Sequence, residues 1–176
     1  MSSDGRGMGM RLAPTVAAMT ILVAACGSSD DAAPEPGSTV EATSPRTIEI
    51  AGTEADIHLP PESSEAAPVV VMLHGTEGDR TRMNPLAGAV AADGSLVYVP
   101  SWPVIDQVAG FPEGEGDEPY RRQSEAVICT LREIRRTAAE YGGDPDDLTV
   151  VGHSGGGWIG ARVALVDEPP WPGIDC

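Results

Sequence analysis

Hydrophobic and polar residues alternate in different ways along the chain, and each pattern predicts a particular kind of element. Residues 47–50 and 55–59 alternate with a period of two, which predicts two short strands joined through Gly52 as a hairpin. Residues 69–73 form a continuous apolar run, which is typical of a strand buried on both faces. Residues 96–99 predict another strand, so the first half of the folded region is rich in β-structure.

Helical spacing appears between these strands and after them. Residues 85–92 predict a short helix, and residues 119–141 predict a long one that Gly142 ends. Along the long segment, apolar residues recur at alternating intervals of four and three, which places them on one helix face. These residues are Val127, Leu131, Ile134, Ala138 and Tyr141.

A further strand at residues 148–151 precedes a helix that begins near Gly155. The complete order is β-β-β-α-β-α-β-α. Right-handed crossovers between parallel strands then predict an α/β fold. Its sheet is mostly parallel with an antiparallel N-terminal hairpin, and helices cover both faces. At 176 residues the chain holds one domain at most.

The turn from this last strand into the helix carries the sequence Gly152-His153-Ser154-Gly155-Gly156. A Gly-x-Ser-x-Gly pattern between strand and helix is the layout of a nucleophile elbow, in which a strained serine projects outward. Gly152 and Gly156 lack the Cβ atoms that would collide as the two elements close on each other. The pattern therefore indicates Ser154 as a catalytic nucleophile.

Two motifs together resemble the α/β-hydrolase superfamily. Leu73-His74-Gly75-Thr76-Glu77-Gly78 follows the third strand, and the elbow follows the fifth. Residues 141–146 are also similar to bacterial esterases, lipases and dienelactone-hydrolase-like proteins, and the resemblance covers about residues 47–166. It implies an N-terminal portion of that fold acting on carboxylic esters, without a cofactor. Ser154 would be the nucleophile, and the backbone N–H groups of Thr76 and Gly155 would form the oxyanion hole.

The chain departs from the family pattern after Ser154. The family places its acid and then its histidine base beyond the serine, but no histidine follows Ser154 here. Of the three histidines, His74 and His153 belong to the motifs, and His58 lies on an early strand, where we expect it to be half exposed. Two interpretations remain open. The chain is either a serine esterase that is truncated or impaired, or a non-catalytic envelope lipoprotein that keeps part of the fold as a binding or structural module.

The first 25 residues predict a lipoprotein signal peptide. Arg6 and Arg11 precede an apolar stretch, residues 12–25, that is too short to span a bilayer. The stretch ends in Val-Ala-Ala followed by Cys26, which resembles a bacterial lipoprotein cleavage box with lipidation at Cys26. The alternative is an ordinary secretory signal with an incidental cysteine. Either interpretation predicts an exported protein, and lipidation predicts a membrane anchor in the cell envelope.

Residues 26–46 predict a disordered tether, because they contain little that can be buried. The folded region is then residues 47–176, a partial α/β-hydrolase domain. An incomplete sheet leaves an exposed edge strand, which favours association with another chain. We also expect Trp102 to line a substrate pocket and Trp158 to lie in the core.

Cysteine content and charge narrow the chemistry further. With Cys26 assigned to lipid, Cys129 and Cys176 remain as an even pair, and export favours a disulfide between them over two unpaired thiols. No Cys-x-x-Cys or histidine cluster predicts a metal site. The net charge of −16 disfavours nucleic acid as a partner.

Overall fold

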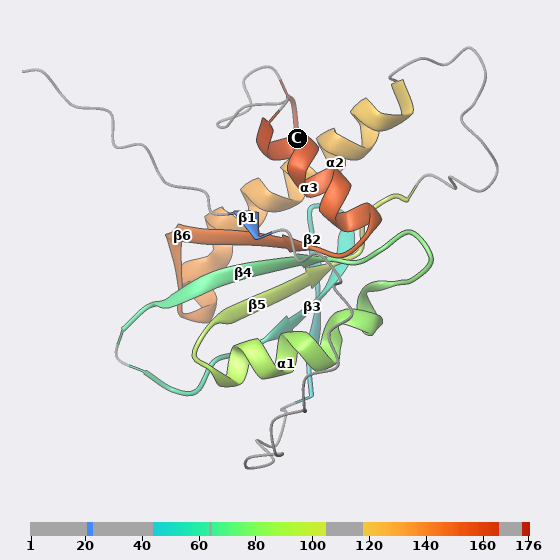
Figure 1. Ribbon diagram of the computed structural model, residues 1–176. Coiled ribbons are helices and arrows are strands. Elements are labelled where there is room, and N and C mark those ends of the chain that lie inside the picture. Colours follow the sequence, from blue (N-terminus) through green and yellow to red (C-terminus); the bar gives the residue numbers. More distant parts are fainter. Residues whose placement is uncertain (1–20, 23–43, 64, 105–117, 166–173) are drawn as a thin grey trace, which may run out of the picture.

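Three parallel strands form the centre of the sheet: β4 (Ala67–Leu73), β5 (Leu96–Pro100) and β6 (Gly143–Gly152). β4 lies between the other two (Figure 1). The computed structural model describes residues 21–22, 44–63, 65–104, 118–165 and 174–176. The predicted third, fourth and fifth strands are therefore confirmed as neighbours in one parallel sheet.

An antiparallel hairpin extends this sheet on the β5 side. β2 (Arg46–Ile50) and β3 (Thr53–His58) pair with each other, and β3 pairs antiparallel with β5. The two-residue turn between them has φ of 49° at Ala51 and 75° at Gly52. Positive φ at both central residues is what a tight hairpin turn requires, which is why Gly52 lies there.

On the opposite side, β1 (Ile21–Leu22) pairs parallel with Val150 and Val151 of β6. The strand order is β1-β6-β4-β5-β3-β2. The predicted fold class, a mostly parallel sheet with an antiparallel N-terminal hairpin, is confirmed. β1 lies within the segment that the sequence predicts as a signal peptide, residues 1–25. The rest of that segment, and Cys26 after it, lie outside the described residues.

Helices cover both faces of the sheet (Figure 1). α1 (Asn84–Ala92) lies on one face, and α2 (Glu118–Thr137) and α3 (Gly155–Leu165) lie on the other. Two short 3-10 helices, η1 (Arg80–Met83) and η2 (Ala138–Tyr141), precede α1 and follow α2. Gly142, with φ of 81°, ends η2 in the left-handed region that favours glycine. No described helix combines the length and the apolar character that crossing a membrane requires.

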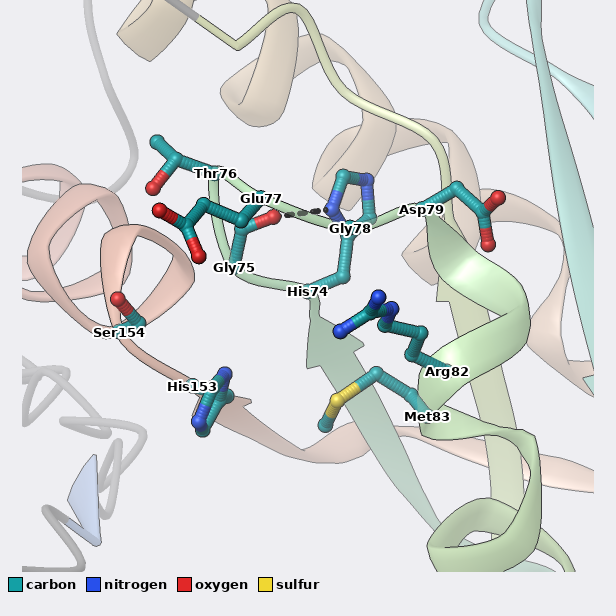
Figure 2. Close-up of a pocket in the computed structure, with 10 residues that line it drawn as sticks. All are labelled: His74, Gly75, Thr76, Glu77, Gly78, Asp79, Arg82, Met83, His153 and Ser154. Atoms are coloured by element: carbon teal, nitrogen blue, oxygen red, sulfur yellow. Dashed lines mark hydrogen bonds between the residues drawn. The ribbon is translucent and has the colours of Figure 1, made fainter. Parts of the chain in front are cut away.

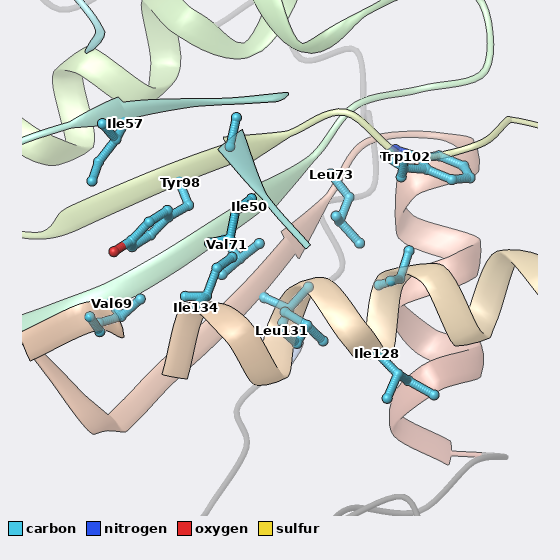
Figure 3. Packing of buried hydrophobic residues seen from close by; sticks show 14 of the residues in the cluster. Ile50, Ile57, Val69, Val71, Leu73, Tyr98, Trp102, Ile128, Leu131 and Ile134 are labelled. Atoms are coloured by element: carbon cyan, nitrogen blue, oxygen red, sulfur yellow. The ribbon is translucent and has the colours of Figure 1, made fainter. Parts of the chain in front are cut away.

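The strands alternate their side chains between two cores, one on each face. Along β4, Val69, Val71 and Leu73 join the core beneath α2 and α3, whereas Met72 joins the core beneath α1. Figure 3 shows the first of these cores, to which α2 contributes Ile128, Leu131 and Ile134. Burying each such side chain is worth about 1.5–3 kcal/mol, so the amphipathic face of α2 is what attaches the helix to the sheet.

A disulfide between Cys129 on α2 and Cys176 attaches residues 174–176 to the same face. One N–H of the Arg132 guanidinium donates to the carbonyl oxygen of Ile174 at 2.7 Å, which adds a second link. The two cysteines are 47 residues apart. Closing a loop of that length stabilises the fold by up to about 4 kcal/mol in the chain-entropy account.

A buried polar cluster lies where β3 meets η1 and α1. The carboxylate of Asp56, which is 3% exposed, accepts hydrogen bonds from Thr47 Oγ1 at 2.8 Å, Asn84 Nδ2 at 2.9 Å and Arg80 Nε at 3.1 Å. His58 Nε2 lies 3.2 Å from Asn84 Oδ1. The expectation that His58 is half exposed is wrong: it is 3% exposed, because α1 covers this end of β3.

Acid should remove the stabilisation that the Asp56 carboxylate provides. Burial raises the pKa of Asp56, but the hydrogen bonds from Asn84, Thr47 and Arg80 outweigh burial and hold the pKa below its usual value. A depressed folded-state pKa gives stability that is present above the unfolded pKa, near 4, and is lost as the pH falls through the folded-state pKa.

Asp56→Asn should therefore lower the free energy of unfolding by about 2 kcal/mol at pH 7, the usual worth of hydrogen bonds to a charged group. Urea unfolding of both proteins at steps from pH 7 to pH 3 measures the difference. The difference should shrink below about pH 4. A difference that stayed constant over this range would show that the ionised carboxylate is not the stabilising form.

Candidate active site

Ser154 lies in a sharp turn between the end of β6 at Gly152 and the start of α3 at Gly155. Its φ is 52°, in a region that side chains other than glycine rarely adopt, and the residue is exposed. Its carbonyl oxygen accepts hydrogen bonds from the backbone N–H groups of Gly157 at 2.9 Å and Trp158 at 3.1 Å, which form the first turn of α3. The structure thus holds a strained, outward-facing serine at a helix N-terminus.

Glycines make this turn sterically accessible. A Cβ added at Gly152 would lie 2.4 Å from the backbone of Gly156, and one added at Gly156 would lie 2.1 Å from the carbonyl oxygen of Leu73. The same carbonyl oxygen accepts a hydrogen bond of 3.0 Å from the N–H of His153. The elbow therefore packs directly against the end of β4, closer than a residue with a Cβ atom at position 156 would permit.

This seating brings the loop after β4 to the start of α3. A Cβ added at Gly155 would lie 3.3 Å from the backbone nitrogen of Thr76, and one added at Gly75 would lie 3.3 Å from Ser154 Cβ. Gly155 is the first residue of α3, where N–H groups have no intrahelical partner and the helix dipole is positive. The sequence-predicted residues Thr76, Ser154 and Gly155 therefore converge at the C-terminal ends of adjacent parallel strands.

A cavity of about 530 Å³ opens over Ser154 (Figure 2). His153 and Ser154 form one wall, and residues 74–79 form the rest together with Arg82 and Met83. The pattern of motifs did not single out Arg82 and Met83 as lining residues. Arg82 reaches the cavity because its side chain lies over Gly78, where an added Cβ would be 2.8 Å from Arg82 Cδ.

The three histidines occupy different environments. His74 is 4% exposed, its Nδ1 lies 2.9 Å from the carbonyl oxygen of Gly75, and its ring centroid is 5.5 Å from that of Trp102. His153 lines the cavity, and His58 contacts Asn84. Within the described ranges, none of these rings hydrogen-bonds to Ser154 Oγ. The described residues thus bring together a serine and the backbone amides of Thr76 and Gly155, but no histidine that hydrogen-bonds to the serine.

Three acidic residues follow Ser154 in the sequence: Asp167, Glu168 and Asp175. Asp175 is exposed near the disulfide, whereas Asp167 and Glu168 lie outside the described residues. Trp102 is buried, and its Nε1 donates to the carbonyl oxygen of His74 at 3.2 Å, so it supports the loop from behind instead of lining the cavity. The described part of the chain holds no group of three or more residues suited to a metal ion.

Trp158 corrects another expectation. It is 44% exposed instead of lying in the core, and its ring contacts that of Tyr120 edge-on, with the ring centroids 5.0 Å apart. Its position one turn into α3 predicted burial, but Ile159 and Val163 are the α3 residues that face the sheet.

The chain belongs to the alpha/beta hydrolase family, whose family model matches residues 70–174. It is 30% identical over 115 residues to carboxylesterase 3B of Mus musculus, an alignment that covers 62% of the chain and 20% of that protein.

Solved structures show the same fold. The crystal structure of DphMB1 superposes with a TM-score of 0.58 and 29% identity, over 74% of this chain and 41% of that one. A thermophilic esterase, Est2 of Thermogutta terrifontis, superposes with a TM-score of 0.59 and 18% identity, over 77% of this chain and 49% of that one. The chain thus spans less than half the length of these relatives.

Replacing Gly156 should disrupt the elbow, whereas replacing a glycine one turn later should not. Gly156→Ala forces a methyl group against the Leu73 carbonyl, which should cost at least about 3 kcal/mol of unfolding free energy. At Gly160 an added Cβ would lie 3.6 Å from Val150 Cγ1, an ordinary contact. Gly160→Ala should therefore stabilise the protein by about 0.5–1 kcal/mol through helix propensity. Urea unfolding of both variants tests the contrast, and equal stabilities would contradict it.

Proposed function

We propose that this chain is part of a serine hydrolase that acts on carboxylic esters, with Ser154 as the nucleophile. The observation that carries the proposal is the strained, exposed Ser154 beside the backbone amides of Thr76 and Gly155. The similarity to carboxylesterase 3B supports an ester as the substrate class. No cofactor is needed for this chemistry.

In the proposed mechanism, Ser154 Oγ attacks an ester carbonyl carbon in the cavity and its proton passes to a general base. The carbonyl oxygen becomes an oxyanion that accepts hydrogen bonds from the N–H groups of Thr76 and Gly155. Each such donor is worth about 2.7–4 kcal/mol in the transition state. The positive end of the α3 dipole acts at the same point. The alcohol then leaves, and water releases the acyl group from Ser154.

A second candidate function is a non-catalytic envelope module that retains part of the fold. It is favoured by one observation, that no described histidine hydrogen-bonds to Ser154 Oγ. Such a module would use the cavity or the outer edge of β6 for binding. Among the described residues, only Val150 and Val151 of β6 pair with a strand on that side. Association with another chain through this edge is part of this candidate function.

We also propose that the protein is exported and anchored to the cell envelope through lipid at Cys26. The support is the arginine-flanked apolar stretch that ends in Val-Ala-Ala-Cys. In this proposal, the tether places the catalytic or binding face outside the cytoplasm. The net charge of −16 disfavours nucleic acid as a partner.

A fluorophosphonate probe distinguishes the two functions. The 176-residue chain should label weakly at Ser154, because no described histidine hydrogen-bonds to Ser154 Oγ. A serine triad without its base keeps only about 10³–10⁴-fold catalysis over water. A form extended to a downstream histidine in the same reading frame should label strongly, and Ser154→Ala should abolish labelling. Turnover of p-nitrophenyl esters by the 176-residue chain at ordinary esterase rates would show that one of its own histidines is the base. Absence of labelling in the extended form would refute the hydrolase proposal.

Mass spectrometry of the mature N-terminus tests the anchor. We expect a chain that begins at an acylated Cys26, and Cys26→Ser should release the protein from the membrane fraction. An intact Met1, or an unmodified Cys26 in membrane-bound protein, would contradict lipidation.

A further inference from the structure

The loop that carries Thr76 is held at both ends by residues outside the elbow. It leaves β4 at Leu73 and ends at Arg80, the first residue of η1. At its start, Trp102 Nε1 donates to the carbonyl oxygen of His74 at 3.2 Å. Within it, the N–H of Gly78 donates to the carbonyl oxygen of Gly75 at 3.3 Å. The position of Thr76 therefore depends on where these two ends are fixed.

Arg80 fixes the second end. Its Nε donates to Asp56 at 3.1 Å, and the same guanidinium contacts Ser101 Oγ at 3.2 Å and Glu54 at 3.1 Å. The Arg80 side chain is 19% exposed and that of Asp56 is 4% exposed, so this ion pair is far less screened than a surface pair. A planar guanidinium that donates in two directions fixes orientation as well as distance.

The residues that bind the Arg80 guanidinium belong to the sheet or directly follow one of its strands, and not to the loop. Asp56 and Glu54 belong to β3, and Ser101 directly follows β5. From Arg80 the chain continues into η1, whose start Asp79 caps by accepting a hydrogen bond from the N–H of Thr81 at 2.9 Å. A rigid end four residues from Thr76 limits how far its amide can move. That limit matters because an oxyanion donor acts only within about 2.7–3.1 Å of the developing charge.

We infer that the Arg80–Asp56 ion pair is a positioning element for the proposed oxyanion hole: it holds the loop 75–79 so that the Thr76 amide faces Ser154. Neither residue touches the cavity, and both act through the loop. This inference rests on the proposed serine hydrolase function. It gives a role to a buried charge pair that the reaction itself does not use.

Hydrogen exchange followed by NMR tests the positioning without any need for activity. In Arg80→Gln, the amides of Gly78, Thr81 and Arg82, which are hydrogen-bonded within the loop and η1, should exchange about 10-fold faster, whereas the amides of β4 should not change. Arg80→Lys keeps the positive charge but cannot donate in two directions. Exchange of these amides in Arg80→Lys should therefore be faster than in the unmodified protein and slower than in Arg80→Gln. Arg136→Gln is the matched control, because it breaks an exposed arginine–glutamate pair with Glu133 on α2.

Fluorophosphonate labelling supplies the second measurement, in the form of the protein that labels Ser154. Arg80→Gln should lower the rate constant of the bond-forming step at least about 10-fold with little change in probe affinity, because misplacing a donor acts on the transition state. Arg80→Lys should recover part of the rate, and Arg136→Gln should match the unmodified protein.

The outcomes separate the two ideas. Unchanged loop amides in folded Arg80→Gln, or exchange that rises equally in β4, would overturn the positioning role, as would faster loop exchange with an unchanged labelling rate. Faster loop exchange with no labelling in any form would refute the hydrolase function and leave the restraint of the loop intact.

If Arg80→Gln does not fold, Ser101→Ala removes a single acceptor of the guanidinium. It should raise exchange of the same amides about 2–3-fold, and no rise would overturn the inference.

Discussion

Where α3 begins, its backbone lies directly against the carbonyl group of Leu73 at the end of β4. An added Cβ at Gly156 would be 2.1 Å from that oxygen, so the approach is open to glycine alone. The His153 N–H donates a hydrogen bond to the same oxygen, with an N···O distance of 3.0 Å, and this bond holds the elbow against β4. Because β4 and β6 are adjacent and parallel, this one contact aligns the loop after β4 with the first residues of α3. The placing of Ser154, Thr76 and Gly155 follows from it.

Much of the fold could be predicted because the hydrophobic pattern of an element reports which of its faces are buried. A strand buried on both faces is apolar throughout, whereas a helix buried on one face has apolar residues at intervals of three and four. The apolar run of β4 predicts a central strand, and its side chains do alternate between the two cores. The spacing along α2 predicts the buried face that Leu131 and Ile134 form. The elbow could be identified because local geometry requires its glycines. At Gly152 and Gly156, an added Cβ would collide with the backbone a few residues away or with the adjacent strand.

Features that depend on contacts between distant elements left no such pattern. His58 is buried because α1 packs over the end of β3. Trp158 is exposed because Ile159 and Val163 are the residues that α3 directs into the core, while the Trp158 ring contacts Tyr120 and Arg162 instead. Asp56 and Arg80 are 24 residues apart in a chain that contains 27 acidic residues, so nothing in the sequence selects this pair. Periodicity reports which face is buried, but it does not report which element covers that face.

The strain at Ser154 bears on the choice between a hydrolase and a binding module. Among the described residues, two non-glycine residues have positive φ: Ala51, in the hairpin turn, and Ser154. A non-glycine residue in this region costs about 1–3 kcal/mol, which the surrounding structure must offset. A binding module has no physical need for a strained serine at that point, because glycine would form the same turn without the cost. Nucleophilic attack does need it, since the turn exposes the hydroxyl beside the backbone amides of Thr76 and Gly155. The described residues thus maintain, at a cost in stability, a serine geometry that the proposed acyl transfer would use, and this favours the hydrolase proposal.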